Sequence, residues 1–529
     1  LINVPDINLR SNLYTTEDFL DSLQVSKNYM ADQNLYIRER IFDMWTGDWN
    51  KMNENWEWQS HTVNDSVIYT PIVIDRNHAF TKVDGVLFKQ MLKMLSLDFI
   101  CNYDSLILKD TKKINKLAFA LDMAVAGRSD ESVWIRQAQE IRRQMTDSLI
   151  DSAFTYLPEG VKHDEIELIK RKLKRRRLEL EAVASQYYRL LQRTPVVAGT
   201  NQSDYFLIER QAPDRTVLRI YDPETGDCRL EQQFSGKETK ELWLYGLAGN
   251  DTFEVKGNTR KDFPIYLISG EGENQYQLNH NRKIHVYDKD YKYDYQKIKY
   301  HKISFTPWGI YDSDKGISLG TFFTYTMYGF KRAPFTYQHR IGYNYLKGFM
   351  YAGIFPNYDG RRRLYLNASI SSPRNFENFF GFGNNTAGYK EEKKNYNRVK
   401  LRTYMFNPSF EMDLRKEEVM TFFGSLDMYK AKRTDDRYIY TVYGEDHPIF
   451  RTNYFVGLGA TYRITKQPYS WLPLLETEWT AGWKMNLKKP ERNFPYAQGS
   501  LSWNVRFSDR FTWASLMKGT VLFDNDYEF

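Results

Sequence analysis

The sequence predicts three parts: an α-rich N-terminal domain (1–195), a small β-rich soluble domain (196–300) and an antiparallel transmembrane β-barrel (301–529). Apolar residues recur at three-and-four spacing in the first part, which is typical of helices, and alternate strictly in the last, which is typical of strands. The alternating segments reach about 11–13 residues, whereas soluble strands usually have about five or six and a membrane-spanning strand needs about 9–11. The chain holds 33 Phe, 12 Trp and 39 Tyr, and more than half of them follow residue 300.

Composition excludes several classes of protein. The 529 residues include 74 Lys and Arg against 67 Asp and Glu, so the net charge is only +7 and no nucleic-acid partner is expected. Two cysteines, Cys101 and Cys228, are too few for a disulfide scaffold. No run approaches eighteen apolar residues, so no transmembrane helix is predicted. A mean hydropathy of −0.63 is compatible with a barrel, because only every second residue of a strand faces lipid.

The first part is predicted to be mostly helical. Residues 15–18, Thr-Thr-Glu-Asp, are expected to form a capped helix start before an apolar run, and residues 133–153 place their apolar side chains on one face. A second long helix is expected over about 164–191, and it contains the basic run 170–177. That run either contacts an anionic partner such as lipid headgroups or is a solvated helix face with Leu173 and Leu178 turned inward, and we favour the solvated face.

The second part is predicted to consist of short strands and turns. Segments 246–253 and 269–276 resemble each other, because in both glycines precede an Asx residue and then an aromatic one. Stacked turns of this kind can bind Ca²⁺ through residues such as Asp251 and Asn274. The alternative, which we favour, is a pair of tight turns in which glycine adopts positive φ and Asx bonds the backbone.

The alternating strands of the third part predict which residues face lipid and which face the lumen. The residues expected to face lipid are Tyr454, Val456, Leu458, Tyr462, Trp479, Trp483 and Trp503. Those expected to face the lumen are Arg340, Glu476, Glu478, Lys484 and Arg506. Phe455 alone interrupts the polar or small face of its strand. Charges on the inner face of a compact sandwich would be costly, which favours a wide barrel over a soluble sandwich or propeller.

Three segments of the last part carry a resemblance to a known family. They are Ile317–Gly320, Tyr328–Phe330 and the loop 372–386, which contains Phe379, Phe380, Gly381, Phe382, Gly383 and Asn384. Residues 303–529 resemble the surface-antigen barrels of Gram-negative bacteria, relatives of the outer-membrane assembly factors BamA and TamA. The resemblance implies a cell outer-membrane location with periplasmic soluble domains, outer-membrane lipid and other outer-membrane or periplasmic proteins as partners, no cofactor, and a role in inserting or translocating proteins or lipids. It also implies that the chain is no enzyme.

Strand number sets a further expectation. Barrels of this family have about sixteen strands, whereas roughly eleven segments alternate between Ile303 and Phe523. We therefore expect more strands, either beyond Phe529 or from another chain, because an open edge in lipid leaves main-chain groups unpaired. The alternatives are a structural or accessory subunit of an outer-membrane complex, and a membrane-anchored enzyme with a kinase-like or lost N-terminal catalytic domain.

A second resemblance concerns the N-terminal part. Residues 47–52 and 74–80 resemble the catalytic core of atypical protein kinases of the secretory type, in which one carboxylate orients the hydroxyl and another binds Mg²⁺. Asn50 stands at the catalytic Asp position, and Asp75 keeps the metal-ligand position. This implies a degenerate, inactive kinase-like fold. The alternative is a helical scaffold with core or interface aromatics, namely Trp45, Trp49, Trp56 and Trp58. The chain contains no HExxH, CxxC, GxSxG or GxxxxGK[ST] motif.

Overall fold

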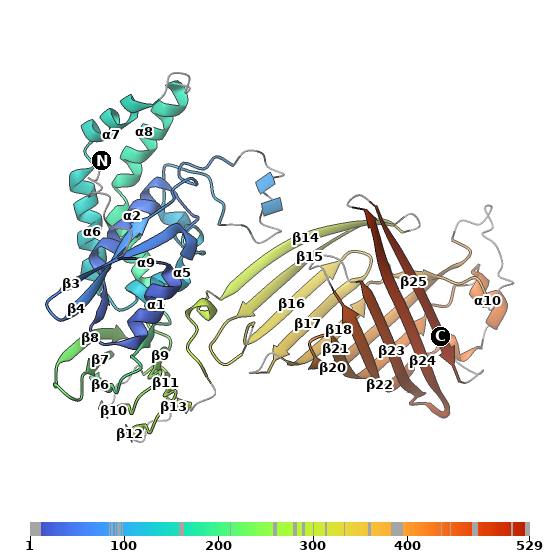
Figure 1. Ribbon diagram of the computed structural model, residues 1–529. Coiled ribbons are helices and arrows are strands. Elements are labelled where there is room, and N and C mark those ends of the chain that lie inside the picture. Colours follow the sequence, from blue (N-terminus) through green and yellow to red (C-terminus); the bar gives the residue numbers. More distant parts are fainter. Residues whose placement is uncertain are drawn as a thin grey trace. The chain divides into compact units, whose positions relative to one another are not determined.

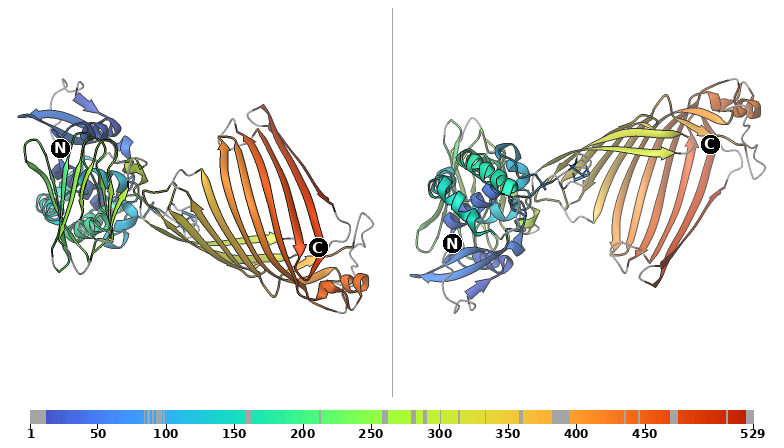
Figure 2. Two further views of the ribbon diagram at one scale, coloured as in Figure 1. Left: turned by 90° about the horizontal axis from the view of Figure 1, so that it is seen from below. Right: turned by 90° about the horizontal axis from the view of Figure 1, so that it is seen from above.

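The computed structural model forms two compact units, Leu1–Lys299 and Tyr300–Phe529 (Figures 1 and 2). It describes residues 12–523 apart from 84, 86–87, 90, 93–96, 98, 158–162, 212, 258–261, 279–282, 288–290, 300, 313–314, 333, 358–360, 382–394, 435, 445, 468–473 and 509–510. Within these residues, no helix is both long and apolar enough to span a membrane.

The first unit is helix-rich at its N-terminal side. Its helices are α1 (Thr16–Val25), α2 (Gln33–Thr46), α4 (Thr111–Ile114), α5 (Phe119–Ala126), α6 (Glu131–Gln144), α7 (Asp147–Ala153), α8 (His163–Arg177) and α9 (Leu180–Leu191), with short 3₁₀ turns η2 (Asn53–Asn55), η3 (Leu108–Asp110), η4 (Phe154–Tyr156) and η5 (Tyr295–Lys297). As predicted, α1 has a capped start: the side chain of Thr15 accepts a hydrogen bond from the Asp18 amide. Gly47 ends α2 in the left-handed conformation, with φ of 78°.

Both long helices predicted from the sequence are interrupted. The first breaks between α6 and α7, where Thr146 caps the new helix by accepting from the Leu149 amide. The second breaks between α8 and α9 at Leu178, which is 50 % exposed and does not turn inward as predicted, whereas Leu173 is buried. At the first break, a local capping residue therefore outweighs the apolar periodicity that runs through it, whereas the N-cap residue of α9, Glu179, makes no side-chain capping bond.

A small sheet lies in the part predicted to be mostly helical. Its strands are β1 (Leu13–Tyr14), β2 (Tyr29–Ala31), β3 (Trp56–Val63) and β4 (Ser66–Val73), in the order β1-β3-β4-β2. Trp56 and Trp58 are buried core residues of β3, not of a helix, and Trp58 stacks on Phe19 with 3.7 Å between ring centroids. The alternation of these tryptophans with Glu57 and Gln59 is a period-two signal that the helical prediction overlooked.

The remainder of the first unit consists of two further sheets. Their strands are β5 (Val196–Ala198), β6 (Tyr205–Gln211), β7 (Arg215–Tyr221), β8 (Cys228–Ser235), β9 (Leu242–Tyr245), β10 (Thr252–Gly257), β11 (Ile265–Ile268), β12 (Gln275–Leu278) and β13 (Ile284–Tyr287). One sheet has the parallel order β13-β11-β9-β5, and in the other, β12-β10-β6-β7-β8, the first three strands are parallel. Inward side chains of both sheets, such as Phe206, Leu244 and Leu267, form one core.

The second unit is a single large antiparallel sheet. Its strands are β14 (Lys302–Asp312), β15 (Gly316–Met327), β16 (Tyr337–Asn344), β17 (Gly348–Pro356), β18 (Arg362–Ser371), β19 (Phe376–Asn378), β20 (Arg398–Arg415), β21 (Glu418–Ala431), β22 (Asn453–Lys466), β23 (Leu475–Asn486), β24 (Lys489–Ser508) and β25 (Phe511–Leu522), with helix α10 (Tyr438–Tyr443) and 3₁₀ turn η6 (Pro448–Phe450) between β21 and β22. Apart from β19, which pairs with β20, successive strands are neighbours from β14 to β25. The sheet is curved but not closed in Figure 2.

Candidate functional site

The strand register sorts the side chains of the large sheet onto two faces. Directly opposed residues of antiparallel strands share a face. Leu458 is directly opposite Trp483, and Tyr462 is directly opposite Trp479. Arg463 is directly opposite Glu478, and this pair lies on the other face of the sheet. The predicted lipid-facing set, Tyr454, Val456, Leu458, Tyr462, Trp479, Trp483 and Trp503, therefore lies on one face. The predicted lumen-facing set, Arg340, Glu476, Glu478, Lys484 and Arg506, lies on the opposite face.

The first of these faces, which we name the apolar face, exposes large hydrophobic side chains along the sheet. Ile317 is 70 % exposed, Leu458 is 62 % exposed and Trp479 is 61 % exposed. Monomeric soluble proteins rarely expose contiguous apolar patches of more than a few hundred Å². The apolar face therefore needs an apolar environment. The sequence predicts that this environment is lipid.

The other face, which we name the polar face, carries paired charges. Lys484 Nζ lies 2.6 Å from Asp427 Oδ2, and Arg363 Nε lies 3.0 Å from Glu411 Oε1. Phe455, the exception in the predicted pattern, is buried on this face beneath the Lys484 ammonium, 5.6 Å from its ring centroid. Two open hollows of about 300 and 320 Å³ lie on this side, one beside Arg340 and one beside Lys484.

The two ends of the sheet are edge strands. Among the described residues, β14 pairs only with β15, and β25 pairs only with β24. Each edge leaves a row of main-chain N–H and C=O groups on its outer side. Such groups can pair with another strand. The large hydrophobic side chains Phe305 and Trp513 are 60 % and 57 % exposed on these two strands.

The predicted family loop is described only at its beginning. Phe379 joins an aromatic cluster with Tyr438 and Tyr443 of α10, with ring centroids 5.9 and 5.7 Å away. Gly381 has φ of 97°, which favours glycine. Phe380 precedes it, and Phe382, Gly383 and Asn384 lie outside the described residues.

The kinase-like positions come close together through a lysine. The Asn50 amide donates to Asp48 Oδ1 at 3.3 Å, and buried Lys51 donates to Asp48 and to the main-chain carbonyl of Asp75. The Asp75 carboxylate accepts from the Asn77 amide at 2.6 Å. Within the described ranges, no group of three or more His, Cys, Asp or Glu side chains is placed to hold a metal ion.

Next to these positions is a buried charge network that sequence reasoning missed. Arg40 donates to Asp122 at 2.8 Å and to Asp43 at 3.0 Å, and Arg76 donates to Asp43 at 2.9 Å. Burial raises the pKa of the Asp43 carboxyl, while the Arg40 guanidinium opposes that rise. Each charge has a partner here, so the network orders α2 against its neighbours.

The repeated turns of the first unit stack on one another, and there are three of them. Residues 199–204, 246–251 and 269–274 each join a strand of one sheet to a strand of the other. Asp251 Oδ1 accepts from the Asp204 amide, and Asn274 Oδ1 accepts from the Asp251 amide, both at 2.9 Å. The Asx side chains thus bond the backbone of the adjacent turn. Burial raises the pKa of the Asp251 carboxyl to about 8.

The basic run 170–177 makes contacts within the first unit. Buried Arg176 donates to the carbonyls of Met44 and Trp45 at 2.6 and 2.7 Å, so it satisfies the C-terminal end of α2. Lys174 lies 2.8 Å from Asp151. These contacts account for part of the run without an anionic partner.

Comparison with known proteins identifies no family. No family model matches the chain, and no curated protein matches it. Among solved structures, BamA from Haemophilus ducreyi lacking POTRA domains 1–3 is similar, with 12 % identity and a TM-score of 0.31. The similarity covers 47 % of this chain and 45 % of that one, so the chain spans less than half of the BamA structure. A likeness at this level does not bear on function.

Proposed function

We propose that the large sheet is part of an outer-membrane β-barrel, with its apolar face in lipid and its polar face toward a lumen. The observation that supports this is the separation of exposed Ile317, Leu458 and Trp479 from the paired Lys484 and Asp427 by strand register alone. In lipid, exposed apolar side chains are favourable and paired charges are best kept away from the hydrocarbon. A soluble protein would have to hide the apolar face.

We further propose that this protein acts in outer-membrane biogenesis, in the insertion or translocation of proteins or lipids. The edges at β14 and β25 support this role, because an unpaired edge can template an incoming strand by β-augmentation. This mechanism needs main-chain hydrogen bonding and no covalent chemistry. The first unit would then lie in the periplasm and contact other components.

A test depletes the protein from living cells. We expect newly made, unrelated outer-membrane barrels to accumulate in their unfolded form, measured by their mobility on gels without heating, before growth stops. Restoring the full chain should restore folding. Normal barrel folding after complete depletion would contradict the biogenesis role.

The second candidate is an accessory subunit that uses the sheet as an anchor. It is favoured by the size of the first unit, which has its own sheets and cores. Purification from native membranes separates the two candidates. Stable stoichiometric partners, together with unchanged barrel folding after depletion, would favour the accessory role.

A further inference from the structure

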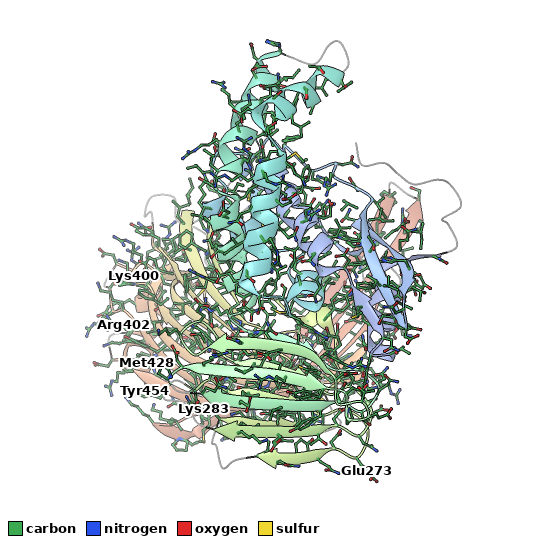
Figure 3. All side chains as sticks on the ribbon, turned by 90° about the vertical axis from the view of Figure 1, so that its left-hand side faces the viewer. Glu273, Lys283, Lys400, Arg402, Met428 and Tyr454 are labelled. Atoms are coloured by element: carbon green, nitrogen blue, oxygen red, sulfur yellow. The ribbon has the colours of Figure 1, made fainter. Side chains whose placement is uncertain are left out.

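At one end of β20 and β21, the apolar face changes into a cluster of basic side chains. The cluster consists of Lys400 and Arg402 on β20, Lys430 on β21 and Lys432 directly after it, and we name it the cationic cluster. All four side chains are exposed. Figure 3 shows Lys400, Arg402, Met428 and Tyr454 one after another along the sheet.

The four cations stand as two facing pairs. Arg402 is directly opposite Lys430, and the Lys432 amide donates to the Lys400 carbonyl at 2.8 Å, which continues the pairing past the end of β21. Like charges directly opposite each other on antiparallel strands are destabilising. The arrangement therefore has a cost in the chain alone, and an anion between the strands would remove it.

Within the described part of the chain, no carboxylate relieves this repulsion. Glu377 of neighbouring β19 is opposite Val399, which points to the other face, and its carboxylate lies 2.9 Å from Lys315. By contrast, Arg415 at the other end of β20 lies 3.4 Å from Glu418. Among the residues that the structure describes, the cationic cluster thus differs from the opposite end of the same strands in having no acidic partner.

The position of the cluster indicates the nature of its anion. On the same face, the next residues toward the middle of the two strands are Tyr404 and Met428, which are directly opposite each other. Phe406 and Leu426 follow them. In membrane barrels, aromatic side chains mark the interface between the apolar band and the polar headgroups. Cations one step beyond this band lie at headgroup depth, where phosphate groups are the available anions.

We propose that the cationic cluster binds the phosphate groups of anionic lipids at the rim of the sheet. This inference rests on the proposed membrane placement of the apolar face, and it adds a class of ligand and a site. Arg402 supplies a planar guanidinium that suits bidentate phosphate contacts, and the lysines supply point charges. Lipid bound here would hold β20 and β21 at a defined depth.

The test measures phosphatidylglycerol binding to the full chain in detergent by native mass spectrometry. The variant is Arg402→Gln with Lys430→Gln. The matched control is Lys416→Gln with Lys466→Gln, which removes two exposed cations near the opposite ends of the strands, in the β20–β21 turn and at the end of β22. We expect binding about 30-fold weaker in the variant, which corresponds to ~1 kcal/mol per charge. The control should stay within about twofold of wild type.

Two further measurements distinguish loss of the lipid site from misfolding of the variant and from binding of free phosphate. The variant should unfold at the same temperature as wild type or higher, because a repulsive pair has been removed. Phosphatidylcholine should bind weakly to both, and inorganic phosphate should not displace phosphatidylglycerol at equal concentration. Equal binding by variant and wild type, equal loss in the control, or displacement by inorganic phosphate would each overturn the proposal.

A separate measurement distinguishes a wrong membrane placement from a wrong lipid site. Spin labels at positions 479 and 481 report the placement, since a lipid-soluble quencher should reach them in phosphatidylcholine vesicles. If it does not, the proposed function fails. If it does and the variant still binds phosphatidylglycerol as wild type does, only the cationic cluster fails.

Discussion

Asp251 is a carboxyl that the fold keeps away from water. It is fully buried, its Oδ1 accepts the Asp204 amide, and its Oδ2 has no hydrogen-bond partner. Burial raises its pKa to about 8, above the ~3.9 of an unfolded chain. The folded state therefore holds this proton more tightly than the unfolded state does, and stability falls as pH rises from about 4 to about 8.

Replacing Asp251 by Asn should remove this pH dependence. An amide keeps the Oδ1 acceptor and cannot ionise, and Asn274 already occupies the same place in the next turn. The slope attributable to Asp251 is up to about 1.4 kcal/mol per pH unit. Urea unfolding of the first unit at pH 5 and pH 8 measures it. A variant that loses as much stability as wild type between these values would contradict the assignment.

Leu458 and Glu478 test the two faces of the large sheet residue by residue. Leu458→Arg should cost about 2–4 kcal/mol in a bilayer, because it places a cation in hydrocarbon near the middle of β22. Glu478→Gln should cost little, since its side chain points to the polar face. Reversible unfolding from lipid vesicles measures both. Equal costs for the two variants would show that the face assignment is wrong.

The stacked turns depend on small residues at their first position. A Cβ added at Gly246 would lie 2.1 Å from Asp251 Oδ2 and 2.5 Å from the Ser269 carbonyl oxygen, and the latter belongs to the backbone and cannot turn away. We expect Gly246→Ala to destabilise the first unit by about 1–3 kcal/mol.

Gly519 of β25 provides the control, because a Cβ there meets no atom within 4 Å. Urea unfolding of the first unit, followed by tryptophan fluorescence, compares Gly246→Ala with Gly519→Ala. A Gly246→Ala protein as stable as wild type would contradict the close approach of the two turns.

In the segment from Gly47 to Lys51, Asn50 stands at the expected position of the catalytic Asp, and its neighbours Asp48 and Lys51 are buried charges. Asn50 cannot accept a proton, and Lys51 is held by Asp48 and by the Asp75 carbonyl. We propose that this unit transfers no phosphate, so the full chain should bind ATP weakly or not at all, and Asn50→Asp alone should not create kinase activity. Equilibrium dialysis with labelled ATP tests binding. Phosphate transfer that Asp75→Ala abolishes would refute this proposal.

At the scale of the whole molecule, the proposed membrane placement makes a demand on the two edge strands of the large sheet. An unpaired edge in hydrocarbon costs several kcal/mol for each unsatisfied group, so each edge needs a partner strand. If the protein inserts other barrels, that partner changes as clients arrive and leave.

A photo-crosslinking residue at Phe305 or Trp513 should therefore capture newly made barrel proteins in living cells. The same residue at Leu458, within the sheet, should not, because β22 is paired on both sides. Mass spectrometry of the crosslinked products identifies the captured chains. Products that are unchanged when synthesis of new barrels is blocked would argue for permanent neighbours and against insertion.

Several features followed from sequence alone because their causes are local. The two faces of β22 and β23 could be predicted from alternation, since side chains of a strand point to opposite sides whatever the strand pairs with. Thr15 could be predicted as a cap because its bond reaches only three residues ahead. That lipid covers the apolar face, and that the polar face lines a lumen, stay predictions.

Only the tertiary structure decided the features that join distant residues. β1 pairs with β3, and the turn at 199–204 stacks on its equivalent at 246–251, although the paired residues are up to 46 and 47 positions apart in the sequence, respectively. The cationic cluster likewise arises because the β20–β21 register places Arg402 opposite Lys430. The sequence alone determined which side of strands such as β22 and β23 is apolar, since that depends on backbone geometry. The folded chain determined which strands meet, since pairing is selected by burial summed over the whole sheet.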